Sequence, residues 1–184
     1  MKKIKNNTTT ITNIIASSGS FDIELIESLG TDDYKSLMEI SASLAEDYGE
    51  KYLLTKNTIN KYFNRSGALP IIARFDNKII GYIIGMPLEL LSQEPWVRLD
   101  ENYGKFNTLY TYAFVIKNDF KRKGYAKILK KVYISWAKKK REFSTILDMS
   151  NQVFLKNLKV KSKLSQRLIT GKVQEKYLNI IVEI

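Results

Sequence analysis

The 184-residue chain contains no cysteine and no histidine. Without cysteine it has neither disulfide bonds nor a thiolate nucleophile. Without histidine it lacks the side chain that most often serves as a general base near neutral pH, and the loss of both residue types excludes most zinc sites. We therefore expect no metal site.

Long apolar runs are also missing. No run approaches the roughly 20 residues that a membrane-spanning helix needs. The basic start at residues 2–5 is followed by polar residues, and residues 11–16 are too short and polar for the core of a signal peptide. We expect a cytoplasmic protein with no membrane partner. The length and the 44% hydrophobic content fit one globular domain.

Positive charge is concentrated in the second half of the chain, within a total of +11. Residues 1–100 carry 11 basic and 13 acidic side chains, whereas residues 101–184 carry 19 basic and 6 acidic ones. This asymmetry indicates a polyanionic partner, which could be a nucleic acid or a phosphorylated coenzyme.

Hydrophobic periodicity predicts alternating strands and helices after a polar start. Residues 1–20 are rich in Thr, Asn and Ser and are predicted to be flexible, leaving 21–184 as a single domain. Helices are predicted from Thr31 to about Gly49, from Thr58 to Phe63, and through Ala126–Ala137. Strands are predicted at 21–25, 70–75, 78–86, 108–116, 143–149 and 177–184.

The segment after the predicted strand Thr108–Ile116 carries the strongest functional signal. A short polar turn leads into a helix at Lys121-Arg122-Lys123-Gly124-Tyr125-Ala126. Free N–H groups and the dipole at a helix start attract anions, and a glycine lets a phosphate approach the backbone. The three basic side chains add positive charge. The segment therefore predicts a pyrophosphate site.

These six residues resemble the acetyl-CoA signature of the GNAT N-acetyltransferase superfamily, Gln/Arg-x-x-Gly-x-Gly/Ala. The signature stands five residues after an apolar strand end, here Ile116, and Lys121 replaces the usual Gln or Arg. The order of elements over residues 21–149 also matches. The resemblance implies an α+β GNAT fold: a central mixed, mostly antiparallel sheet of six to seven strands flanked by helices.

The same resemblance implies the reaction and the coenzyme contacts. Acetyl-CoA would donate its acetyl group to a primary amine of a small molecule or protein. Its pantetheine arm would lie between splayed strands and pair with the backbone near Phe114, Val115 and Ile116. An N–H group there would polarise the thioester carbonyl. Many relatives dimerise, so a homodimer is considered.

The proton acceptor is less well defined. Histone-type relatives use a Glu six residues before the end of the signature strand, and Tyr110 occupies that position here. Tyr112 and Phe114 are predicted to share its strand face, as pocket wall or core. Glu89 is a further candidate base, or alternatively a solvated loop acid. The catalytic candidates are thus Tyr110, Tyr112 and Glu89, while Glu94 and Asp100 are candidates for attracting a cationic amine.

The resemblance ends at about Leu147. Relatives place a Tyr some seven residues into the next helix, but residues 150–172 contain none. Two explanations stay open: a genuine variant with its own last helix, or a single-base frame change in the tail. In a shifted frame, residues 147–150 can read Gly-His-Val, and residues 170–182 can give a basic, aromatic terminal strand. The coding DNA distinguishes the two.

Two other functions compete with catalysis. A degenerate GNAT domain would bind the coenzyme without turnover, as the tail suggests. A nucleic-acid-binding module would use the basic stretch Lys121–Lys140, whose lysines fit a solvated helix face equally well. No helix-turn-helix, zinc or aromatic RNA-binding motif is present, so a nucleic-acid partner is the weaker alternative.

Overall fold

A computed structural model describes residues 8–48, 50, 53–140 and 143–147. Its six strands form one sheet in which the spatial order equals the chain order, β1-β2-β3-β4-β5-β6. Neighbouring strands are antiparallel except β5 and β6, which are parallel. The strands are β1 (Ile11–Ser18), β2 (Phe21–Ser28), β3 (Leu69–Phe75), β4 (Lys78–Pro87), β5 (Thr108–Ile116) and β6 (Thr145–Leu147).

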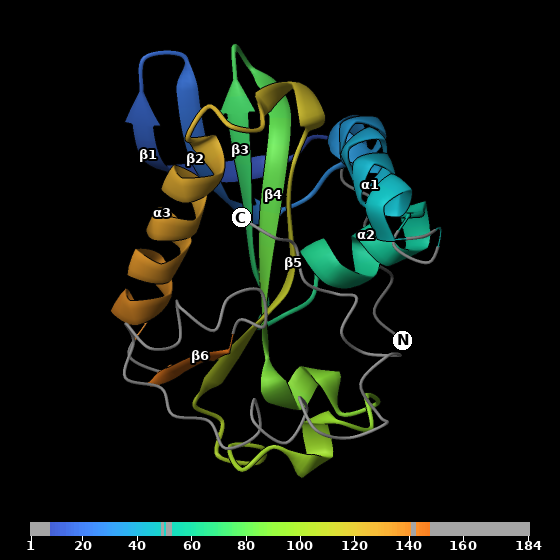
Figure 1. Cartoon of the computed structure of the whole chain (residues 1–184), viewed down its shortest axis with the longest axis vertical. Coiled ribbons are helices and arrows are strands. Elements are labelled where there is room, and N and C mark those ends of the chain that lie inside the picture. Colours follow the sequence, from blue (N-terminus) through green and yellow to red (C-terminus); the bar gives the residue numbers. More distant parts are fainter. Residues whose placement is uncertain (1–7, 49, 51–52, 141–142, 148–184) are drawn as a thin grey trace.

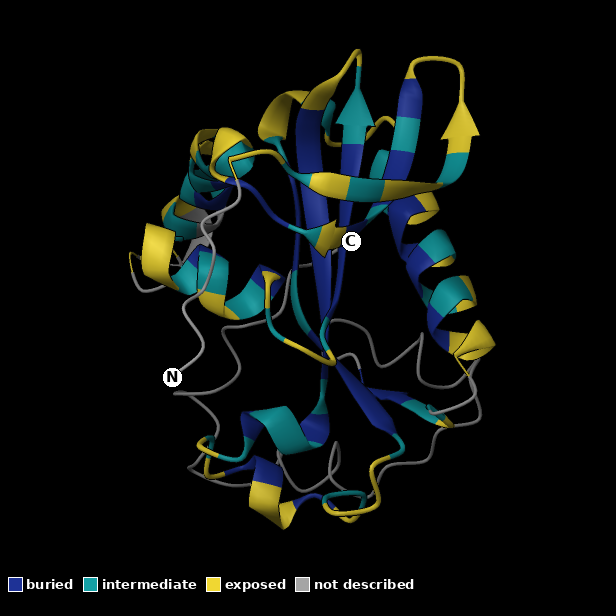
Figure 2. Cartoon of the chain, turned by 180° about the vertical axis from the view of Figure 1, so that it is seen from behind, coloured by how far each residue is buried: buried dark blue, intermediate teal, exposed yellow. Residues whose placement is uncertain are grey.

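Helices cover both faces of the sheet (Figure 1). Helices α1 (Tyr34–Tyr48) and α2 (Lys56–Phe63) pack on one face, and α3 (Tyr125–Lys139) packs on the other. Figure 2 shows buried residues along the central strands and exposed residues on the outer turns of the helices. The sheet and its two helical layers confirm the predicted α+β architecture.

Local sequence signals explain most element boundaries. Thr55 and Thr58 form a reciprocal capping box that starts α2. Asp76 and Asn77 both adopt positive φ angles of 47° and 61° in the β3–β4 hairpin, as the tightest hairpin turns require. The helix predicted from Thr31 begins with a single 3₁₀ turn at Thr31–Asp33 before α1.

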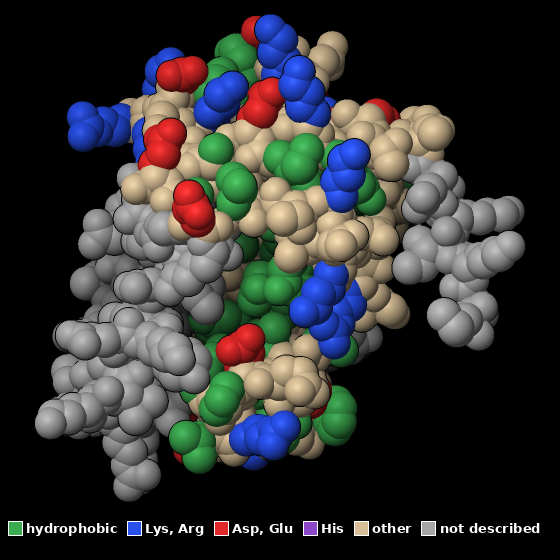
Figure 3. Space-filling view, turned by 90° about the vertical axis from the view of Figure 1, so that its right-hand side faces the viewer, with side chains coloured by type: hydrophobic (Ala, Val, Ile, Leu, Met, Phe, Trp, Pro, Cys, Tyr) green, Lys and Arg blue, Asp and Glu red, His purple; other side chains and the backbone are tan. Residues whose placement is uncertain are grey.

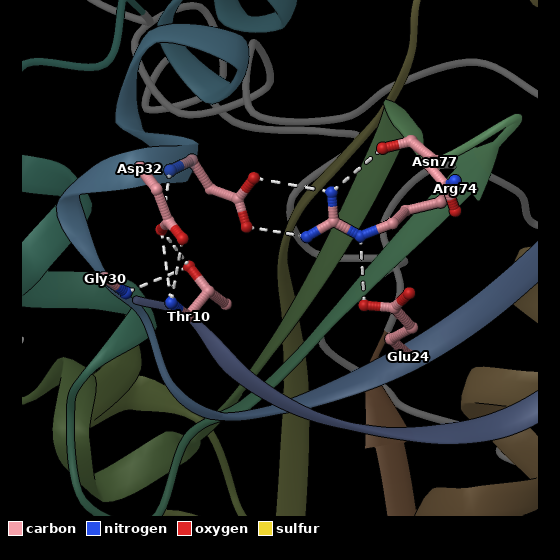
Figure 4. Close-up of polar contacts among 7 residues, drawn as sticks. Thr10, Glu24, Gly30, Asp32, Arg74 and Asn77 are labelled. Atoms are coloured by element: carbon pink, nitrogen blue, oxygen red, sulfur yellow. Dashed lines mark hydrogen bonds and ion pairs between the residues drawn. The ribbon is translucent and has the colours of Figure 1, made fainter. Parts of the chain in front are cut away.

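The prediction that residues 1–20 are flexible is wrong for residues 11–18, which form strand β1. This edge strand pairs antiparallel with β2. Its entry is fixed by Thr10, whose N–H and hydroxyl donate to the Asp32 carboxylate, the hydroxyl at 2.7 Å (Figure 4). The polar composition hid a strand that exposes one side to water. The strand predicted at 177–184 lies outside the described residues.

A β-bulge in β5 changes which side chains share a face. Gly85 pairs with Thr111, and the adjacent Ile84 pairs with Ala113, so Tyr112 is an extra residue. The prediction that Phe114 shares the face of Tyr110 and Tyr112 is therefore wrong. Phe114 packs into the core under α3, whereas both tyrosines belong to the core under α1 and α2.

Candidate functional site

The loop between β5 and α3 presents backbone to the solvent at a helix start. Gly124 is the N-cap of α3 with φ of 86°, and no side chain caps that end of the helix. Arg122 is also left-handed, with φ of 62°. Residues 121–124 are all exposed. The free N–H groups of the first helical turn, together with three flanking cations, form a geometry suited to a phosphate group.

The glycine is required by backbone conformation, and not by crowding within the chain. A Cβ on Gly124 would meet no atom within 4 Å. Its positive φ is one that residues with side chains seldom adopt, and the space beside it is open. This open space is where a pyrophosphate would approach the helix.

Tyr125 anchors the start of α3 to the sheet. Its ring lies 4.7 Å from Phe21 of β2 and 5.6 Å from Phe75 of β3, measured between centroids. Phe120 packs on the same cluster, 5.8 Å from Phe75. These contacts turn the Tyr125 side chain inward, so its contribution to the loop is its N–H group. The aromatic cluster holds the loop in position without occupying it.

Among the described strands, none pairs with one edge of β5 beyond the bulge. Strand β6 pairs with residues 108–110 only, and no other described strand pairs with that side of β5. On the opposite side of β5, strand β4 pairs with it as far as Ile116. Within residues 8–147 as far as they are described, the sheet is thus open beside residues 112–116, next to the α3 loop, which provides an edge for an extended ligand.

The hydrogen-bond pattern shows which backbone N–H and C=O groups of β5 face that edge. Lys117 donates its N–H to Ile80 of β4 at 2.7 Å, and the Val115 carbonyl also faces β4. Because successive residues of a strand point their backbone groups to opposite sides, Phe114 and Ile116 present theirs to the free edge. Of the three residues predicted to contact pantetheine, Val115 is thus engaged within the sheet.

The tyrosines proposed as catalytic lie near the bulge. Tyr110 is 2% exposed and packs against Trp96, with ring centroids 4.9 Å apart. Burial, hydrogen bonding with Tyr62 and the nearby negative charge of Glu94 raise the pKa of Tyr112 far above that of a free phenol. Tyr112 therefore stays protonated at neutral pH, where it can donate a hydrogen bond and cannot serve as a base.

Glu89 lies at the far end of the sheet, where it organises a loop. One carboxylate oxygen accepts hydrogen bonds from the N–H groups of Gly104 (3.1 Å) and Phe106 (2.9 Å). The other oxygen is buried and has no partner among the described residues. Asp100 holds the same loop by accepting from the N–H and side-chain amide of Asn102. These bonds favour structural roles for both acids.

Two residues near the site were not predicted from the sequence. Tyr62 of α2 packs on Tyr112 with ring centroids 4.5 Å apart, whereas the sequence had predicted only the helix Thr58–Phe63 that contains it. Lys130 of α3 is 3% exposed, with its ammonium 5.9 Å from the centre of the Phe114 ring. A lysine on a lysine-rich helix gives no sequence signal of burial.

Comparison with known families identifies the fold. The profile described as "Acetyltransferase (GNAT) family" matches residues 34–159. The chain belongs to the GNAT acetyltransferase family. The match covers both helices on one face, the signature loop and α3. No curated protein matches the sequence.

Solved structures agree with this GNAT fold. An aminoglycoside acetyltransferase from an uncultured soil metagenomic sample, solved with sisomicin, superposes with a TM-score of 0.53 at 17% identity, covering 78% of this chain and 90% of its own. A ribosomal-protein-alanine N-acetyltransferase from Brucella melitensis biovar Abortus 2308 gives 0.51 at 20% identity, covering 77% and 87%. At these identities the likeness shows the fold alone.

Two further observations concern metal binding and membrane insertion by this GNAT domain. Within the described ranges, no cluster of three or more carboxylates, histidines or cysteines is arranged to bind a metal ion. In the same residues, no helix combines the length and the apolar character needed to span a bilayer.

Proposed function

We propose that this GNAT protein is an N-acetyltransferase that moves an acetyl group from acetyl-CoA to a primary amine in the cytoplasm. The observation that carries the proposal is the uncapped start of α3 at Gly124, placed beside the free edge of β5. The pyrophosphate would bind the N–H groups of residues 122–126, and Lys121, Arg122 and Lys123 would supply positive charge.

The free edge would hold the pantetheine arm. Phe114 and Ile116 are the residues with outward N–H and carbonyl groups, so they would pair with its amides as a strand does. One of these N–H groups would donate to the thioester carbonyl oxygen, which gains negative charge when the amine attacks. Val115 contributes through the sheet, by fixing the edge against β4.

The transfer itself needs few side chains. The neutral amine attacks the carbonyl carbon, the new C–N bond forms, and the C–S bond breaks to release the thiolate of coenzyme A. The amine loses one proton and the thiolate gains one. Holding amine and thioester together supplies much of the rate enhancement. Protonated Tyr112 would donate a hydrogen bond near the reacting groups, and water would carry the proton from the amine.

Calorimetric titration with acetyl-CoA tests the proposal, using Gly124→Glu as the disabled variant. A carboxylate at Gly124 would stand in the open space beside the helix start and repel phosphate, so the affinity should fall roughly tenfold or more. Gly104→Glu is the matched control. Gly104 has nearly the same φ, 85°, and equal open space. It belongs to the connection between β4 and β5, which lies at the opposite end of the sheet from the start of α3 (Figure 1).

Turnover is measured by release of free thiol from acetyl-CoA over a panel of amines. Because the chain contains no cysteine, a thiol reagent reports only coenzyme A. Coenzyme binding with no acetylated amine would favour the degenerate domain considered from the tail. Absence of coenzyme binding, together with salt-dependent DNA binding, would favour the nucleic-acid module and overturn the proposal.

A further inference from the structure

A second feature of the molecule lies on the face of the sheet opposite α3. Figure 3, which views the α1 and α2 side, shows a recess lined by hydrophobic side chains, with an acidic side chain at its lower edge and basic side chains at its right edge. On this side Tyr62 of α2 stacks at a tilt on Tyr112 of β5, with 36° between the ring planes. Both rings are partly exposed. The buried pair Trp96 and Tyr110 packs in the same core.

Glu94 adds a negative charge to this aromatic pair. Its side chain is partly exposed and lies close enough to Tyr112 to oppose ionisation of the phenol. The ion pairs among the described residues engage Glu24, Asp33 and Glu39, and none engages Glu94. A carboxylate beside two aromatic rings is an environment that attracts a cation, since the ring faces are electron-rich.

The Tyr62 ring has a cation contact in this structure. The amine of Lys61 lies 5.3 Å from the centre of the Tyr62 ring. Lys61 is exposed, so its side chain can leave the ring for water at little cost. The Tyr62 ring therefore accepts a primary ammonium in this structure, and a ligand nitrogen would take the place of the lysine or share the ring with it.

The recess adjoins the edge that would hold the thioester. Tyr112 is the bulge residue, and the described pairing of β5 with β6 ends at Tyr110. A ligand on Tyr112 thus lies next to the free edge that begins at the same residue. The recess and the thioester edge require different protonation states of an amine. The recess favours a protonated nitrogen, whereas attack on a thioester requires a neutral one. An acceptor with two nitrogens satisfies both requirements.

We propose that the recess formed by Tyr62, Tyr112 and Glu94 binds a protonated nitrogen of a small di- or polyamine, and thereby directs a second nitrogen of the same molecule to the thioester. This inference rests on the proposed acetyl transfer and names its acceptor class. It excludes simple monoamines as good substrates. It assigns Glu94 and Tyr62 to binding and specificity, and not to proton transfer.

Paired substrates test the assignment. Putrescine and n-butylamine have the same carbon chain, and only putrescine has a second nitrogen for the recess. Thiol release should give putrescine a kcat/KM roughly tenfold or more above that of butylamine, the range of a desolvated cation contact. Glu94→Gln should raise KM for putrescine, leave kcat little changed, and reduce the preference toward one. Glu101→Gln, which neutralises an exposed acid in the same part of the chain, should keep the preference.

The aromatic contribution has its own variants. Tyr62→Phe keeps the ring and should retain the putrescine preference, whereas Tyr62→Leu keeps the bulk, removes the ring, and should lose it. Lys61→Gln removes the competing cation and should lower KM for putrescine. Equal use of butylamine and putrescine by the parent protein, or an unchanged preference in Glu94→Gln, would overturn the inference. So would acetylation of a protein substrate with no diamine activity.

Direct binding separates this inference from the acetyl-transfer proposal. Calorimetric titration of the full chain with spermidine, without coenzyme, should show binding that Glu94→Gln weakens and Glu101→Gln does not. That outcome would support the recess even if acetyl-CoA fails to bind. Spermidine binding that is absent, or equal in the parent and Glu94→Gln, would reject the recess even if acetyl-CoA binds and other amines are acetylated.

Discussion

Arg74 and Asp33 form an ion pair with 2.6 Å between Nη2 and Oδ2, which joins strand β3 to the turn before α1 (Figure 4). The Nε of Arg74 also donates to the buried carboxylate of Glu24 at 3.1 Å. Burial works against the charge on the guanidinium, but hydrogen bonds and the charges of these two acids outweigh it and raise the pKa of Arg74. One guanidinium thus neutralises two acids from separate elements.

Replacement of Arg74 by methionine should destabilise the fold. The substitution leaves Glu24 and Asp33 without their partner inside a partly buried network, at a cost of about 2 to 3 kcal/mol in the free energy of unfolding. Chemical denaturation measures the loss. Lys78→Met, at an exposed position on the next strand, should change stability little. A loss of equal size in both variants would show that the network contributes nothing specific.

Gly81→Ala should weaken coenzyme binding through the backbone of β5. A Cβ on Gly81 would lie 2.5 Å from the carbonyl oxygen of Val115 and would also collide with Ile116. Strand β5 must therefore shift, and with it the edge that Phe114 and Ile116 present. Acetyl-CoA affinity should fall by roughly tenfold.

Gly67→Ala serves as the control for the Gly81 variant. Gly67 has a positive φ of 84°, and its added Cβ would meet only side-chain atoms at 3.6 Å or more. It should lose stability through backbone strain and keep its coenzyme affinity. If Gly81→Ala binds acetyl-CoA as the parent does, the free edge of β5 is not the coenzyme site.

Glu89 is expected to act through the loop that it holds. Glu89→Gln keeps one oxygen for the N–H groups of Gly104 and Phe106, so kcat should stay within about threefold of the parent, whereas loss of a general base costs on the order of a hundredfold or more. Glu89→Ala removes both bonds and should lower the melting temperature. Steady-state kinetics of the two variants separate the roles. A collapse of kcat in Glu89→Gln would restore Glu89 as the base.

Tyr112 should affect stability at alkaline pH and leave the neutral pH–rate profile unchanged. Its pKa is raised in the folded state because burial disfavours the phenolate. The stability that follows is present below the ordinary phenol pKa of about 10 and is lost as the pH rises above it, since only the unfolded chain ionises readily. As the pH rises from about 9 to about 11, across the phenol pKa, the free energy of unfolding should therefore fall less in Tyr112→Phe than in the parent protein.

The same variant tests whether Tyr112 accepts a proton. In Tyr112→Phe the acidic limb of kcat/KM against pH should keep its position, because the phenol is protonated in the parent over that range. A limb that disappears in the variant would show that Tyr112 ionises near neutral pH after all.

The sequence predicted the strands and helices whose residues carry a local signal, and it missed a strand that depends on pairing with another segment. Thr108–Ile116 matched its strand because a continuous apolar run is buried on both faces. Thr58–Phe63 lacked only the first residues of its helix, which the Thr55 cap fixes. Strand β1 was missed because its identity depends on pairing with β2, a partner that local composition does not reveal.

The sequence predicted where the coenzyme loop lies, but it did not predict to which face of the sheet each β5 side chain points. The Gly124 loop was located because glycine and the basic residues carry a local signal. The left-handed Arg122 and the bulge at Tyr112 arise from the fit of β5 against β4, and a period-two pattern cannot show an inserted residue. The same bulge moved Phe114 to the α3 face. The two explanations of the tail after Leu147 concern residues outside those that the structure describes.

The order of the sheet has a consequence for how the protein is made. Because each of the six described strands lies beside its predecessor in the chain, a nascent chain can add these strands one at a time as they leave the ribosome. Ile116 precedes α3 in the chain, so the edge of β5 can form before α3 packs on the sheet. Among the described strands, β3 follows α1 and α2, and β6 follows α3. A chain that ends after β5 would therefore lack α3 and expose the apolar face of the sheet that α3 covers.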